Sequence, residues 1–289
     1  MTTTLASARP KAVLDRNMLV ALAARELRRF VVNPVFLFAV VMTTWVTWGG
    51  RSAVITEIDT VIPYPAIFLG GFGMIAAYSL TRSMRDSEPV VGVVPTTLPV
   101  RTAALCAVAV VPFLCGVVAM LAFLHFHPID ARVYGAFSPP GQVAVLVSQI
   151  VVPSLGGPLL GVALGRWVRF PGAGVVLFLV IFGWENLVTI PSLSHPDSTA
   201  FTALRLFSPF AFFTYTENGP DPTTWRGSPW FFIGWQLALC AIAVLVALLR
   251  GAEGRVRFRV IRTLQIVLVV AVIMLVLAVV GGFSQAVHA

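Results

Sequence analysis

The segment AALCAVAVVPFLCGVVAMLAFLH, residues 103–125, contains no Asp, Glu, Lys or Arg. An α-helix needs about 20 predominantly apolar residues to cross the hydrocarbon core of a bilayer. We therefore predict that residues 103–125 form a membrane-spanning helix, which Pro112 kinks. Cys106 and Cys115 lie inside it, and without a C-x-x-C pair they are interpreted as small buried hydrophobic residues.

The rest of the chain has the same apolar character. Of its 289 residues, 58% are hydrophobic and 11% are charged, and the mean hydropathy is +0.90, whereas about 25% of residues are charged in a typical soluble domain. We expect an all-α polytopic membrane protein with one transmembrane domain. Its predicted spans are residues 34–50, 61–80, 103–125, 143–165, 172–190, 229–249 and 264–283.

The positions of the basic residues predict the orientation, because Lys and Arg favour cytoplasmic loops. With the N-terminus inside, the predicted outer segments hold four of the 20 basic residues, Arg51, Arg132, Arg205 and Arg226. The expected topology is N-in and C-out, with residues 284–289 as an outer tail. Arginines beside anionic headgroups explain the basic pI, so we expect a lipid bilayer and no nucleic acid as partner.

A cytoplasmic tail and an amphipathic helix are predicted in residues 1–33. Apolar residues recur at helical spacing in residues 14–30, and the polar side chains Arg25, Glu26, Arg28 and Arg29 gather towards the end. Such a helix lies on the membrane surface. Pro34 follows Asn33 and suits the first turn of the next helix.

The predicted cytoplasmic loop 81–102 mixes charged and apolar residues, a composition typical of a protein contact. The residues expected to contact a partner are Arg82, Arg85, Asp86, Glu88, Val90, Val91, Val93 and Val94. The only lysine is Lys11, so the phosphate-binding motif G-x-x-x-x-G-K-[ST] is absent. Any ATP-driven role therefore requires a separate ATPase chain.

Glu185 is the one ionisable side chain well inside a predicted span. Intramembrane carboxylates are costly and are candidates for function, here in substrate passage or gating. The alternative is a hydrogen-bonded or snorkelling Glu near the outer headgroups, beside Trp184 and Asn186. Few polar residues of the other spans are expected around it.

The segment 191–229 is predicted to be an outer, partly re-entrant region, because it is apolar and too short to cross twice. Its aromatic residues include Phe207, Phe210, Phe212 and Phe213, which are candidates for a pathway or gate.

Gly157, Gly161 and Gly165 recur every four residues, which is typical of close helix packing. We call these three glycines the glycine seam. It packs either against another helix of the same bundle or against a second subunit. His125 and His127 do not share a helical face, so interfacial residues are favoured over a ligand pair and no metal site is predicted.

The order of these features resembles the permease subunits of type-2 ABC exporters. LAARELRRFVVNPVFLF, residues 22–38, is similar to their amphipathic connecting helix. RSMRDSEPVVGVVPTTLPVRTAAL, residues 82–105, is similar to their cytoplasmic coupling loop, although its start, RDSEPVVG, departs from the usual acidic, glycine-containing pattern. The segment 191–229 matches their outer helices. The family core has six spans, so residues 264–283 would be an added seventh helix.

The resemblance implies a membrane subunit that is not itself an enzyme. It pairs with a second permease, the same or different, and docks on two copies of a cytoplasmic subunit that binds ATP and Mg. Arginine in place of lysine and the Ala/Val bias point to a bacterium, and hence to its cytoplasmic membrane. Two alternatives stay open: a non-transporting anchor or assembly subunit, and an intramembrane lipid-modifying enzyme.

Overall fold

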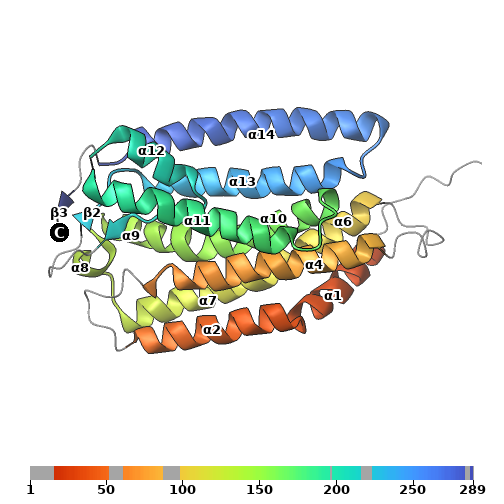
Figure 1. Ribbon diagram of the computed structural model, residues 1–289, viewed down its shortest axis with the longest axis horizontal. Helices are drawn as coiled ribbons and strands as arrows, with labels where there is room; N and C mark the ends of the chain where they lie inside the picture. Colours follow the sequence, from red (N-terminus) through yellow and green to blue (C-terminus); the bar gives the residue numbers. More distant parts are fainter. Residues whose placement is uncertain are drawn as a thin grey trace, which may run out of the picture.

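The computed structural model describes residues 16–51, 61–86, 98–195, 197–215, 223–283 and 287–288. These parts of the chain are mostly helical, and the helices run side by side in one elongated bundle (Figure 1). Four described helices are long and apolar enough to cross a membrane, and a pair bent by 64° is a fifth if it counts as one span. The prediction of a multi-pass helical membrane protein is confirmed.

The described helical segments include, in chain order, those over the predicted apolar runs and three others outside them. They are α1 Arg16–Val31, α2 Pro34–Gly50, η2 Ala66–Phe72 continued by α4 Gly73–Asp86, α6 Leu98–Cys106 continued by η3 Ala107–Ala109 and α7 Val110–Phe126, α8 Ala131–Tyr134, α9 Pro139–Leu146 continued by η4 Val147–Val151 and α10 Val152–Trp167, α11 Ala173–Ser194, α12 Thr199–Phe207, α13 Pro229–Leu249 and α14 Gly254–Val280.

The break between α1 and α2 follows from two adjacent residues. The Asn33 side chain accepts a hydrogen bond from the Val35 amide at 3.0 Å, which caps the first turn of α2. Pro34 occupies the first helical position. Phe30 and Phe36 are buried on either side of the break, with ring centroids 4.5 Å apart. Helix α1 also packs against α6 at this end of the bundle.

Helix α10 is the most deeply buried of the long apolar helices and packs against α4, η2 and α13. A Cβ atom on Gly157 would overlap the Gly70 carbonyl, and one on Gly161 would overlap the Met74 carbonyl. Gly165 lies against Thr81. The predicted glycine seam therefore faces η2 and α4 of the same chain, as close helix packing in membranes requires.

Two π-helical segments, which sequence reasoning did not anticipate, interrupt the bundle. These are η2, which leads into α4, and η4, which leads into α10. The turn of η4 comes just before Pro153, whose missing N–H prevents a regular α-helical hydrogen bond. Wide turns of this kind occur often at functional sites.

Two helices extend beyond the predicted spans. Helix α4 continues through Asp86, so Arg82, Arg85 and Asp86 of the predicted loop 81–102 lie on the same helix as the end of the second predicted span. Helix α14 begins at Gly254, before the apolar run that starts at residue 264. In both cases the helix continues from the apolar run into residues rich in arginine, because arginine is a good helix former.

A small sheet closes the other end of the bundle (Figure 1). Its strands β1 Thr214–Tyr215, β2 Thr223–Thr224 and β3 Val287–His288 pair antiparallel in the order β1-β2-β3. The all-α prediction missed this sheet, and the predicted outer tail 284–289 contributes one of its strands. Two-residue strands are too short to leave an alternating pattern in the sequence.

Candidate functional site

A cavity of about 530 Å³ lies inside the bundle. Its walls come from η2, η4, α10, α11 and α13, with residues around 209–214 at one end. Tyr64, Phe182 and Asn186 line it and are exposed, so the cavity reaches the lateral surface of the bundle. The volume falls in the range of sites for small organic ligands, about 300–1,000 Å³.

Small residues and wide turns make room for this cavity. Gly70, Gly71, Gly156 and Gly157 line it, so two facing elements contribute bare backbone where side chains would fill the space. A Cβ on Gly71 would overlap the ring of Phe178, which brings α11 against η2 below the cavity. Both π-helical segments contribute to the lining.

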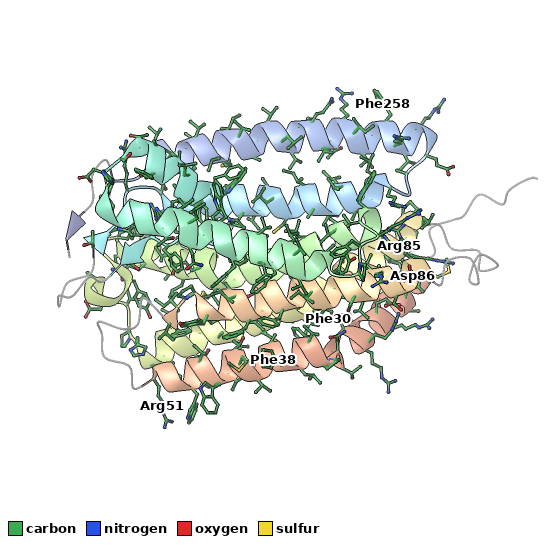
Figure 2. All side chains as sticks on the ribbon, viewed as in Figure 1. Phe30, Phe38, Arg51, Arg85, Asp86 and Phe258 are labelled. Carbon is green, nitrogen blue, oxygen red and sulfur yellow. The ribbon has the colours of Figure 1, made fainter. Side chains whose placement is uncertain are left out.

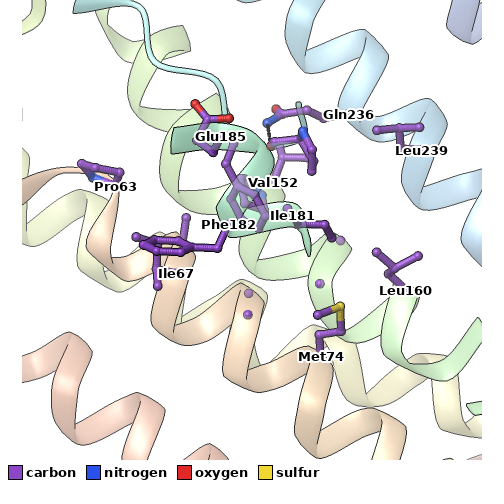
Figure 3. A pocket seen from close by; sticks show the side chains of 18 of the residues that line it. Pro63, Ile67, Met74, Val152, Leu160, Ile181, Phe182, Glu185, Gln236 and Leu239 are labelled. Atoms are coloured by element: carbon purple, nitrogen blue, oxygen red, sulfur yellow. Dashed lines mark hydrogen bonds between the residues drawn. The ribbon is translucent and has the colours of Figure 1, made fainter. Parts of the chain in front are cut away.

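The cavity is polar at one end and apolar at the other. Glu185 and Gln236 lie at the end near the small sheet, whereas Met74 and Leu160 lie towards the opposite end (Figure 3). Gln149 and Thr214 also belong to the lining. The arrangement fits a molecule with a polar head and an apolar body.

Glu185 is buried, with 6% of its surface exposed. Its Oε1 accepts a hydrogen bond from Thr189 Oγ1 at 3.4 Å, and the Ser208 hydroxyl lies beside the carboxylate. Its Oε2 has no hydrogen-bond partner among the described residues. A buried acceptor left in this state costs free energy, which a hydrogen-bond donor from a ligand would recover.

Gln236 is oriented by two backbone carbonyls. Its Nε2 donates to Ser148 O at 2.7 Å and to Pro209 O at 2.8 Å. Only the amide nitrogen can donate to a carbonyl, so these partners fix which end of the amide is the oxygen. Its Oε1 has no hydrogen-bond partner within the described part of the chain.

Arg205 was predicted to lie in an outer segment, yet its side chain is buried in α12. Its Nη2 donates to Arg226 O at 2.6 Å, and the guanidinium lies 4.6 Å from the Trp225 ring centroid. Burial lowers the pKa of Arg205, and the charge of Glu185 acts in the opposite direction. The described residues contain no ion pair closer than 4.0 Å between these two side chains.

The four candidate phenylalanines separate into two groups. Phe210 and Phe212 line the cavity. Phe213 is fully buried away from it and packs edge to face against Phe232. Phe207 is exposed, with its ring 6.0 Å from that of Trp235. The structure therefore brings only Phe210 and Phe212 together with Glu185.

At the other end of the bundle, Arg85 and Asp86 lie near α1 (Figure 2). Arg85 Nη1 donates to the carbonyl oxygens of Gly165 at 3.0 Å and Val168 at 2.8 Å. The Arg85 side chain is therefore bonded to the C-terminal end of α10. Asp86 is exposed, 3.5 Å from Arg82. Glu88, Val90, Val91, Val93 and Val94 lie outside the described residues.

The polar residues of the amphipathic helix do not share one environment. Arg25 and Arg28 are exposed, whereas Glu26 is buried and pairs with Arg29 at 3.0 Å. This pair belongs to the packing of α1 on the bundle, and the two exposed arginines face outward from it.

The prediction that Glu185 has few polar companions was wrong. Gln149 of η4 and Gln236 of α13 line the same cavity as Glu185, and Thr189 joins them from the helix of Glu185 itself. Gln149 and Gln236 are single amide side chains inside apolar runs, which is the signal that would have identified them, since polar groups inside membrane helices usually face the protein interior.

His127 follows the last residue of α7, and its ring lies within hydrogen-bond distance of the last residue of α2. Its Nε2 lies 2.9 Å from Gly50 O, and its own carbonyl accepts a hydrogen bond from Tyr134 Oη at 2.9 Å. Within the described ranges, no group of three His, Cys, Asp or Glu side chains is placed to hold a metal ion.

No protein-family model, curated protein or solved structure matches the chain.

Proposed function

We propose that this chain is the transmembrane permease subunit of an ATP-driven ABC exporter in the cytoplasmic membrane of a bacterium. The observation that carries the proposal is the cavity of about 530 Å³ between η2, α10, α11 and α13. A membrane anchor or assembly subunit has no need for such a space, whereas a permease must hold its substrate within the bundle.

The proposed topology places the arginine-rich end in the cytoplasm. Arg85 and Asp86 lie at this end together with α1, and Arg51 lies at the opposite end (Figure 2). Seven spans run from α2 to α14, and α14 is the added seventh helix packed on α13. Lys and Arg on the cytoplasmic side give this orientation its physical support.

The proposed coupling surface joins α1 and the end of α4, and α1 contacts both α4 and α6. The exposed Arg25, Arg28 and Asp86 lie on these elements. The following residues 87–97 would complete the surface that grips the ATPase. Helix α4 continues directly from η2, which forms part of the cavity wall. A movement of the coupling surface would therefore be transmitted along this one helical stretch to the cavity.

The proposed assembly has two permeases and two ATPase subunits, with ATP and Mg bound by the latter. A substrate enters the cavity from the side, where Phe182 and Asn186 are exposed, and leaves towards the end that holds the small sheet. Closure of the ATPases would narrow the cavity by moving α4 and η2 relative to α11 and α13.

Purification of the tagged full chain from its native membranes in mild detergent tests this function. We expect an ATP-binding chain to copurify and the complex, reconstituted in liposomes, to move substrate only with Mg-ATP. A chain that purifies without an ATPase and shows no ATP-dependent transport would contradict the proposal. Chemical alteration of a membrane lipid by the purified chain would instead favour the lipid-modifying enzyme.

A further inference from the structure

The polar end of the cavity has an imbalance between hydrogen-bond donors and acceptors. Among the described residues that line the cavity, two buried polar atoms lack a hydrogen-bond partner, Glu185 Oε2 and Gln236 Oε1. Both are acceptors, since the Gln236 nitrogen is already committed to Ser148 O and Pro209 O. A ligand that forms hydrogen bonds with these two oxygen atoms must supply the hydrogen-bond donors.

The only charge that the described lining residues can supply at this end is a carboxylate. Glu185 is the only acidic or basic side chain among the described lining residues. The charge of Arg205 acts on Glu185, but the guanidinium donates to Arg226 O and lies over Trp225, and the described residues contain no ion pair within 4.0 Å between the two side chains. A negative charge in a medium of low dielectric constant attracts a cation strongly.

Aromatic rings add a second preference for a cation. Phe182, Phe210 and Phe212 line the cavity together with Glu185. The face of an aromatic ring attracts an ammonium group within about 6 Å. Towards the other end, Met74, Leu160 and Ile181 offer only apolar surface (Figure 3), which fits a hydrocarbon or aromatic body.

We propose that the cavity binds an amphipathic amine, whose protonated head pairs with Glu185 Oε2 and donates a hydrogen bond to Gln236 Oε1. Its apolar body lies along Met74, Leu160 and Ile181. That this amine is the exported substrate rests on the proposed function, whereas its binding does not. The donor requirement distinguishes protonated primary amines from quaternary ammonium ions, which carry the charge without an N–H.

Three matched probes test this on the full chain in lipid nanodiscs: 2-(1-naphthyl)ethylamine, its N,N,N-trimethyl derivative and 2-(1-naphthyl)ethanol. Equilibrium dialysis against empty nanodiscs separates protein binding from partition into lipid. We expect saturable binding of the amine, binding of the trimethyl derivative weaker by about tenfold, and binding of the alcohol weaker still, since a hydrogen bond to a charged group contributes at least this factor. Equal affinity for amine and alcohol, or no saturable binding, would overturn the proposal.

Variants on α11 locate the site. Glu185→Gln removes the charge and nearly preserves the shape, so amine binding should fall at least about tenfold while alcohol binding changes little. Gly183→Ala is the matched control, because a Cβ there meets no atom within 4 Å, and it should bind the amine as the unchanged chain does. Unaltered amine binding in folded Glu185→Gln protein would refute the assignment. If that variant does not fold, the three probes on the unchanged chain decide.

The two proposals fail separately. Amine binding without ATP-dependent transport would leave the cavity assignment standing and remove the exporter. ATP-dependent transport of a molecule without an amine, by a chain that does not bind the naphthyl amine, would support the exporter and contradict the assignment of the cavity to an amine.

Discussion

The Nη1 atom of Arg85 donates to the carbonyl oxygen of Val168 at 2.8 Å and joins the end of α4 to the end of α10. The same nitrogen also donates to Gly165 O at 3.0 Å. The last carbonyls of a helix lack intrahelical partners, and a nearby cation stabilises them. Arg85 therefore links the element that leads to the proposed coupling surface with the central helix of the bundle.

Arg85→Ala should lower the stability of the bundle. Hydrogen bonds from a charged group contribute about 1.5–3 kcal/mol each, and the substitution removes two that share one nitrogen. Thermal unfolding of the purified chain in detergent measures the effect. Arg82→Ala is the control, because its pair with Asp86 is partly exposed and such pairs contribute about 0–1 kcal/mol. Equal losses for the two variants would contradict the role given to Arg85.

Gly157→Ala should disturb the contact between α10 and η2. The added Cβ would overlap the carbonyl of Gly70, so backbone must move, and overpacking of this kind costs about 1–3 kcal/mol. The measurement is the melting temperature together with elution as a single species from a sizing column. Gly49→Ala, whose Cβ has nothing within 4 Å, should leave both unchanged. A Gly157→Ala chain as stable as this control would show that the close approach is not required.

Asn33→Ala should weaken the start of α2. Loss of the side-chain acceptor for the Val35 amide costs about 1 kcal/mol at a helix N-cap. Asn33→Asp keeps an oxygen at the same position and should retain most of the stability, as measured by thermal unfolding of both variants. If alanine and aspartate behaved alike, the cap would not contribute to the fold.

The sequence predicted the parts of this fold that depend on local composition. The apolar run around residue 112 became the continuous helical stretch Leu98–Phe126, and the pair Asn33 and Pro34 correctly marked the start of α2. The spacing of Gly157 and Gly161 also indicated close packing, although not the partner. Each of these signals lies within one turn or one helix.

The cavity could not be predicted in the same way, because it depends on contacts between distant segments. The orientation of Gln236 is set by Ser148 and Pro209, which come from other elements. Arg205 was predicted only to lie in an outer segment, and its contacts with Trp225 and the Arg226 carbonyl join residues about 20 positions apart in the chain. The π-helical turn η4 comes just before Pro153, but a proline interrupts a helix in several ways and does not by itself indicate a π-turn.

Val90→Asp combined with Val91→Asp should separate the chain from its ATPase. These two residues lie outside the described part of the structure, and the prediction rests on their apolar character beside the charged end of α4. A carboxylate placed in an apolar protein contact loses its hydration without gaining a partner, so copurification of the ATPase should fall severalfold or more. The chain alone should keep its melting temperature. Ser83→Asp adds a negative charge at an exposed position of α4 without removing apolar surface and should retain the ATPase. Full copurification with the double variant would show that the valines do not form the coupling contact.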